Sequence, residues 1–183
     1  MQKINYFELL EELSVLSARA VYLTSCKSRA QLQRSLTEIS SIESKATLIL
    51  NGLEEALFTD FLPPLERRSI AEAGHRLCKT IWSSAMILGQ KSQRMGYDKS
   101  FKEYEVCVEL SKLIEESVSM LKKIKKPNQT PKAEEFRKLL NSSRSASRLS
   151  SKKQSSTQNL FCELREELSD CFDGIIEIML CNI

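Results

Sequence analysis

Residues 4–23 read INYFELLEELSVLSARAVYL, and their apolar side chains recur at steps of three and four. Because a helix has about 3.6 residues per turn, this spacing places the apolar side chains on one stripe. The stripe consists of Ile4, Phe7, Leu10, Leu13 and Leu16, with Leu9, Ala20 and Leu23 beside it. The segment therefore predicts an amphipathic helix that buries one face.

The same helical spacing continues along nearly the whole chain. It occupies five further segments, at about residues 29–57, 66–95, 100–124, 133–149 and 160–180. Ser28 is placed to cap the second segment, Met86 belongs to the third stripe and Leu180 to the last. We therefore expect an all-α fold of six antiparallel helices joined by short connections.

Proline and glycine punctuate these segments. The chain has only 5 Gly and 4 Pro, fewer than an architecture of strands and turns would need. Pro63 and Pro64 end the second helix, Gly96 is placed to end the third, and residues 125–132 form a linker. Three helices lie on each side of Gly96. This predicts a single domain over residues 1–183, with two three-helix units at about 1–96 and 97–183. The residues from Ser150 to Thr157 are polar, and we expect them to be loose.

The six cysteines are spread through apolar positions, without a CxxC or CxxH pair. No secretory leader precedes them, so they are typical of small core residues in a reducing cytosol. Cys78 and Cys171 in particular fall on apolar stripes. No stretch reaches the roughly 18–20 apolar residues of a membrane-spanning helix. We therefore expect a cytoplasmic protein that meets a membrane only from its inner face.

Positive charge is concentrated in one part of the chain. Eleven Lys or Arg residues lie between Lys122 and Lys153, against only two acids. Such a stretch favours an anionic partner, whether phosphate groups, an acidic protein face or a lipid surface; it is equally typical of a solvated loop and helix face. The candidate contact residues are Lys122, Lys123, Lys125, Lys126, Lys152 and Lys153.

Several segments resemble a known family. Residues 41–47 read SIESKAT, residues 64–70 read PLERRSI, and residues 164–177 close the chain with an acidic amphipathic helix. In their spacing and in a few residues they resemble the PhoU-like proteins found beside low-affinity, Pit-type phosphate transporters. The resemblance implies a PhoU-like bundle and a role as regulator or adaptor. It implies contacts with a membrane phosphate transporter or a signalling protein.

The family resemblance also implies iron-like clusters held by inward carboxylates, but this chain departs from that pattern. Lys45 and Thr47 stand where the family has acids, and residues 77–82 contain no carboxylate. A hard cation needs several oxygen ligands from more than one helix. What is left is a vestigial set, and we predict neither a tightly bound metal nor a cofactor. Its members are Glu43, Glu66, Asp170 and Asp173.

Signals for catalysis are weak. His75 is the only histidine, and the sequence has no glycine-rich phosphate loop and no cysteine or serine in a nucleophile motif. Trp82 is interpreted as either packing or part of a subunit contact, and exposed apolar residues leave a homodimer open. These observations favour a non-enzymatic regulator or adaptor of phosphate transport. The alternative is nucleic-acid binding by the basic stretch, which lacks the interleaved aromatics that such binding uses.

Overall fold

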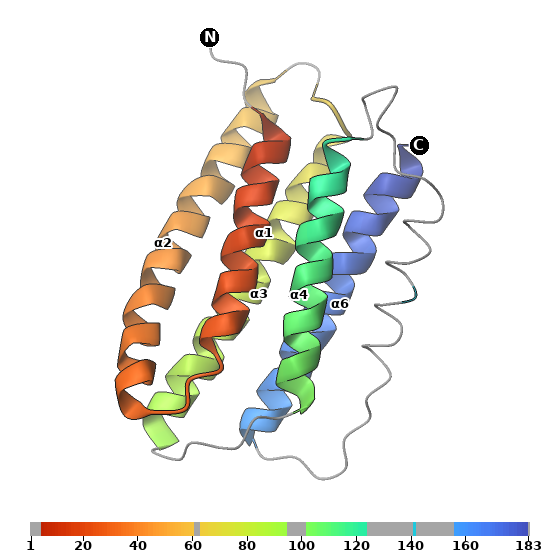
Figure 1. Ribbon diagram of the computed structural model, residues 1–183. Coiled ribbons are helices and arrows are strands. Elements are labelled where there is room, and N and C mark those ends of the chain that lie inside the picture. The colour runs from red at the N-terminus through yellow and green to blue at the C-terminus, as the bar shows by residue number, and fades with distance from the viewer. Residues whose placement is uncertain (1–4, 61–62, 95–101, 124–140, 142–155, 183) are drawn as a thin grey trace.

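The computed structural model describes residues 5–60, 63–94, 102–123, 141 and 156–182. All regular structure in these residues is helical, which confirms the all-α prediction (Figure 1). The predicted fifth helix, residues 133–149, lies almost entirely outside them, so the count of six stays a prediction. The described helices are α1 (Tyr6–Leu23), α2 (Arg29–Thr59), α3 (Arg67–Arg94), α4 (Lys102–Leu121) and α6 (Ser156–Cys181).

A local sequence signal accounts for the start of α2. Ser28 caps α2, since its side chain accepts a hydrogen bond from the Gln31 amide at 3.2 Å, as the sequence predicted. The expectation that the chain stays loose through Thr157 was wrong. Ser156 and Thr157 belong to the first turn of α6, and Thr157 is buried. Thr157 is four residues before Phe161, so it continues the buried stripe of α6 by one turn.

The helices pack around a shared interior. In Figure 1, α1 lies in front of α3, with α2 on one side and α4 and α6 on the other. Contacts join α1 to α2, α3 and α4, and join α6 to α3 and α4. Helix α2 packs on α1 and α3 alone among the described helices. Helix α3 therefore lies between α2 and α6, with one face turned outward.

The consecutive helices α1, α2 and α3 are antiparallel, and helices two apart in the chain are parallel. Helices α1 and α3 run the same way, because Ser17 bonds Thr80 and, further along both, the Thr24 carbonyl accepts from Lys91. Helices α4 and α6 are parallel too, because Gln158 donates to Glu103 and, one turn further along both helices, the Cys107 thiol donates to the Phe161 carbonyl. Helix α2 returns the chain between α1 and α3, so α1 and α3 point the same way.

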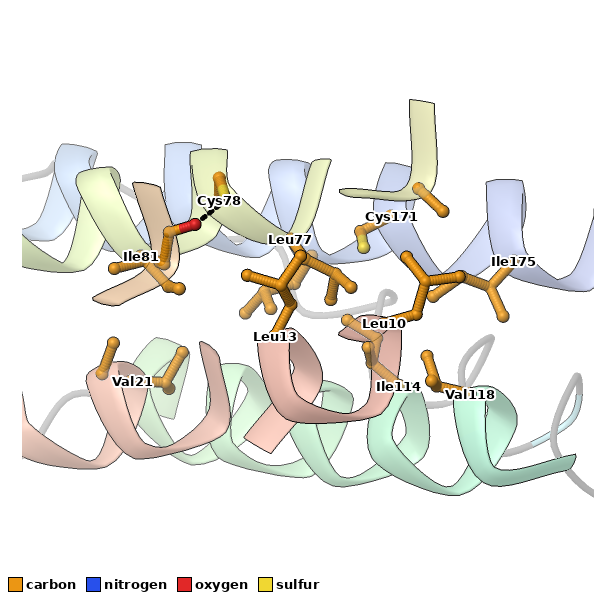
Figure 2. Close-up of a cluster of buried hydrophobic side chains, with 14 of the residues drawn as sticks. Leu10, Leu13, Val21, Leu77, Cys78, Ile81, Ile114, Val118, Cys171 and Ile175 are labelled. Atoms are coloured by element: carbon orange, nitrogen blue, oxygen red, sulfur yellow. Dashed lines mark hydrogen bonds between the residues drawn. The ribbon is translucent and has the colours of Figure 1, made fainter. Parts of the chain in front are cut away.

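One hydrophobic core spans all five described helices. Figure 2 shows its centre, where Leu10 of α1, Leu77 of α3, Ile114 of α4 and Ile175 of α6 point toward one another. Cys78 and Cys171 are fully buried here, as the sequence predicted. The contacts α1–α4 and α3–α6 cross the predicted boundary at Gly96, itself outside the described residues. The two three-helix units remain a prediction.

Two residues assigned to buried stripes are instead exposed. Met86 is 62% exposed and Leu180 is 58% exposed. Met86 lies five residues after the buried Ile81, and five residues turn a helix by about 500°, past the buried face. Leu180 lies in the last turn of α6, which ends at Cys181. The stripe of α3 continues instead through Ser84 and Leu88, both fully buried. None of the described helices is long and apolar enough to cross a membrane.

Candidate protein-contact surface

The outward face of α3 changes character along its length. Its first half carries charged side chains and His75, but its second half carries Trp82, Met86, Gly89 and Gln93. We call these last four residues the uncharged stripe; steps of four, three and four residues place them on one side of the helix. The only charged residue between Trp82 and Gln93 is Lys91, whose ammonium donates to the Thr24 carbonyl at 2.6 Å. Nearly three helical turns of surface thus lack an outward charge.

Trp82 and Met86 make this stripe apolar. Trp82 is 41% exposed and Met86 is 62% exposed, and they lie one turn apart. Other large apolar side chains are exposed on α1, α2 and α6, but successive ones on the same helix are at least seven residues apart. Tyr22, for example, lies under the Arg19 guanidinium, 5.5 Å from its ring centre. Among the described residues, Trp82 and Met86 are therefore the two large apolar side chains that are exposed on successive turns of one helix.

A carboxylate flanks the stripe on the α2 side. The Cys78 thiol lies 3.8 Å from the Ala46 carbonyl, which sets the register of the two antiparallel helices (Figure 2). Glu43 is one turn before Ala46 and Trp82 is one turn after Cys78, so they lie at the same level. Glu43 is half-buried, and burial raises the pKa of its carboxyl group. Its carboxylate makes no hydrogen bond or ion pair with another described residue.

A second carboxylate flanks the stripe on the α6 side. The Ser83 hydroxyl donates to Glu167 at 2.5 Å, and the Lys79 ammonium lies 3.6 Å from the same carboxylate. Helices α3 and α6 are antiparallel, since Arg76 contacts Asp170 and, further along α3, Lys91 contacts Phe161. Glu163 is one turn before Glu167, so it lies about one turn beyond Ser83, at the level of Met86. Glu163 is exposed. The uncharged stripe therefore runs between two carboxylates from different helices, Glu43 and Glu163.

The four residues proposed as a vestigial metal set are not gathered into a site. Glu66 is exposed at the start of α3 and accepts a hydrogen bond from Ser69 at 3.4 Å. Asp170 and Asp173 are exposed on α6, and Glu43 is on α2. No group of three or more His, Cys, Asp or Glu side chains that could hold a metal occurs in the part of the chain that the structure describes. These residues do not supply the several converging oxygens that a hard cation needs.

A groove of about 590 Å³ lies between the start of α3 and the end of α6. Its lining mixes charges, and its two arginines are engaged within the chain. The Arg68 guanidinium pairs with Glu72 at 2.8 Å, and the Arg76 guanidinium donates to the Asp170 carbonyl at 2.5 Å. The first contact lies within α3, and the second joins α3 to α6, so both guanidinium groups have partners in the chain.

The basic candidates are divided between described and undescribed parts of the chain. Lys122 forms an ion pair with Glu11 and so joins the end of α4 to α1. Lys123 is exposed, in a shallow groove that Glu115 and Glu116 also line. Four candidates lie outside the described residues: Lys125, Lys126, Lys152 and Lys153. Lys122 already has a role within the bundle, which makes it a poor choice for a partner contact.

Two buried cysteines are in surroundings that suppress the reactivity of their thiols. Burial raises the pKa of the Cys78 thiol to about 11 and that of Cys171 to about 12, which disfavours the thiolate. Cys181, at the end of α6, is exposed. His75 is on the surface of α3, and its Nε2 lies 2.7 Å from the Glu54 carboxylate. In the described residues His75 is thus partnered by an acid and not by a serine or cysteine.

No known protein-family model matches the chain, and a search of curated proteins finds no match either. From the sequence, Trp82 was interpreted as either packing or part of a subunit contact, and Met86 was assigned to a buried stripe. A signal was present, however: residues 82–93 read WSSAMILGQKSQ, with a single charge, and a glycine falls on the outward face.

Proposed function

We propose that this protein is a non-enzymatic regulator or adaptor that acts through protein contacts, and that the uncharged stripe of α3 is its contact surface. The observation that carries the proposal is the exposure of Trp82 and Met86 on a helix whose other face is in the core. Tryptophan and methionine are enriched in protein interfaces, and charged residues are depleted from their centres. Two large apolar side chains that lie together in water do not stabilise an isolated bundle, and such exposed patches often mark interaction sites.

The resemblance to PhoU-like proteins extends the proposal to phosphate transport. It rests on residues 41–47, 64–70 and 164–177, so it supports a partner of that kind and does not identify one. On this proposal the protein works in the cytoplasm, against a membrane phosphate transporter or a signalling protein at the inner face of the membrane.

The test is capture of an identified partner. Tagged protein is used to pull down proteins from detergent-solubilised membranes, with and without phosphate starvation, and the captured proteins are identified by mass spectrometry. We expect a phosphate permease to be enriched, and we expect Trp82→Ala with Met86→Ala to abolish the enrichment. Leu48→Ala is the matched control, because Leu48 is 72% exposed on α2 and should not affect capture.

A second set of variants separates the stripe from the basic stretch. Lys123→Glu, Lys125→Glu and Lys126→Glu are combined, while Lys122 is kept because it pairs with Glu11. Loss of capture in this variant alone would move the contact from α3 to the basic stretch. Recovery of no permease under either condition would remove the link to phosphate transport.

A further inference from the structure

We propose that the uncharged stripe of α3 receives a basic amphipathic helix of the partner. The partner's apolar row lies on Trp82 and Met86, and its Lys or Arg side chains reach Glu43 on one side and Glu163 on the other. This inference rests on the proposed function, since it specifies the chemistry of the partner for the same surface.

The shape of the stripe suits a helix. From Trp82 to Gln93 it covers twelve residues, which are eleven steps of 1.5 Å or about 16 Å along the helix axis. A partner helix of about three turns covers that length. Gly89 has no side chain, and a Cβ built there meets no atom within 4 Å, so the surface next to Met86 is open. A side chain of the partner helix can approach the α3 backbone at this position, as a ridge of one helix enters a groove of another.

The charge pattern selects a basic partner. Glu43 and Glu163 lie on opposite sides of the stripe, at the levels of Trp82 and Met86, and neither pairs with another described residue. Glu43 is half-buried, and burial raises its pKa. A cation next to it would favour the charged carboxylate and supply hydrogen bonds that the described residues do not supply. An acidic or neutral helix would leave both carboxylates uncompensated.

The same pattern disfavours a second copy of the chain on this surface. A two-fold axis parallel to α3 would place Glu43 of one copy near Glu163 of the other. A two-fold axis across α3 would place each flank against its own counterpart. Because both flanks are acidic, either arrangement brings carboxylates together, and like charges across an interface cost binding free energy. The homodimer that the sequence left open therefore does not suit this face.

The test uses the single tryptophan of the chain, which is Trp82, as a reporter on the surface itself. The probe is a synthetic amphipathic peptide of about 18 residues, long enough to form helix on binding, with leucines on one face and lysines beside them. A matched peptide carries glutamate in place of each lysine. We expect the lysine peptide to shift the Trp82 emission to shorter wavelength in a saturable way, and to bind at least about tenfold more tightly than the glutamate peptide.

The variants Glu43→Gln and Glu163→Gln should each weaken binding of the lysine peptide by about two- to fivefold, because each removes one charge pair at a partly solvated site. Glu109→Gln is the matched control, since Glu109 is exposed on α4, which does not adjoin the stripe. Equal binding of both peptides would overturn the proposal, and so would unchanged affinity in both stripe variants. A concentration-dependent shift of Trp82 emission without peptide would indicate a second copy in place of a basic helix.

The two proposals fail in different ways. If permease capture needs Trp82 and Met86 but the lysine peptide does not bind, the contact surface stands and the basic-helix partner is wrong. If the peptide binds in the expected way but no permease is captured, the partner chemistry stands and the link to phosphate transport is wrong.

Discussion

Tyr6 ties the first turn of α1 to the last turn of α2. Its side chain is almost fully buried, and its hydroxyl lies 3.1 Å from the Ala56 carbonyl and 3.0 Å from the Asp60 carboxylate. Burial and the hydrogen bond to Asp60 raise the pKa of Tyr6 to about 12, because both oppose loss of the phenolic proton. A raised pKa in the folded state stabilises the fold below the unfolded value of 10, and this stabilisation is lost as pH rises from 10 toward 12.

Tyr6→Phe should therefore destabilise the protein at neutral pH by about 1 kcal/mol, the usual contribution of a hydrogen bond. The loss should shrink as pH rises above 10, since the tyrosinate no longer contributes in the parent protein. Urea unfolding at pH 7 and in the alkaline range measures both effects. Tyr22→Phe is the control, because Tyr22 is 55% exposed. Parallel alkaline curves for Tyr6→Phe and the parent would contradict the prediction.

Glu43 has the opposite effect at neutral pH. Burial raises the pKa of its carboxyl group, so folding favours the protonated form, and the stability it contributes is lost as pH rises through the folded pKa. Glu43→Gln should raise the free energy of unfolding at pH 7 by about 0.5 kcal/mol or less, because solvent still reaches the side chain. The gain should vanish at pH 4. A loss of stability at pH 7 would show that the carboxylate has a stabilising partner.

At the scale of the elements, Gly74 allows α3 to approach α2 closely. A Cβ at this position would lie 2.7 Å from Leu53 Cδ2 and 3.2 Å from Leu50 Cδ1. Leu53 is fully buried, so it has little room to move aside. Interiors are close-packed, and an added methyl group displaces its neighbours.

Gly74→Ala should lower the free energy of unfolding by about 0.5–2 kcal/mol, since overpacking outweighs the gain in helix propensity. Gly52→Ala is the matched control on α2. A Cβ there meets no atom within 4 Å, so alanine should stabilise the helix by about 0.5–1 kcal/mol. Chemical unfolding of the two variants gives the comparison. Equal shifts in the two would show that helix spacing does not depend on Gly74.

At the scale of the whole molecule, the core joins helices from both predicted halves. Ile114 of α4 is almost fully buried and points toward α1 in the shared centre (Figure 2). Helix α1 contacts α4 and helix α3 contacts α6, so helices of the two predicted halves share one core. A core continuous across all described helices predicts one cooperative unfolding transition.

Ile114→Ala should lower the free energy of unfolding by about 2–4 kcal/mol. The transition followed by Trp82 fluorescence on α3 should move as far as the transition followed by far-ultraviolet circular dichroism. Because the two helices are in different predicted halves, coincident shifts would indicate one folding unit. A Trp82 transition that stays in place while part of the helical signal moves would indicate two independent units.

The helical periodicity made most of the fold predictable. In each helix the apolar residues recur at steps of three and four, which places them on one face. Leu13 of α1, Leu53 of α2 and Leu168 of α6 belong to such faces, and all three are fully buried. Met86 and Leu180 were assigned wrongly to buried stripes because they are apolar, and their position around the helix was not considered. The residue type alone does not distinguish an exposed apolar side chain from a buried one; the position of the residue around the helix is also needed.

The candidate surface was only partly predictable. Trp82 and Glu43 were noted, but for separate reasons and on separate helices. Their common level depends on the register between α2 and α3, which the contact of Cys78 with Ala46 sets. Such a register comes from side-chain packing between helices and leaves no periodic signal in either one.

The sequence by itself determined that the described residues form helices, where several of them begin, and which side chains most of them bury. These properties depend on local hydrogen bonding and on a repeat of about 3.6 residues, both of which the order of residues contains. Only the tertiary structure decided that α1 runs parallel to α3 and that the uncharged stripe lies between Glu43 and Glu163. Those relations arise from contacts between residues distant in the chain, such as Ser17 with Thr80 and Ser83 with Glu167, and packing selects them.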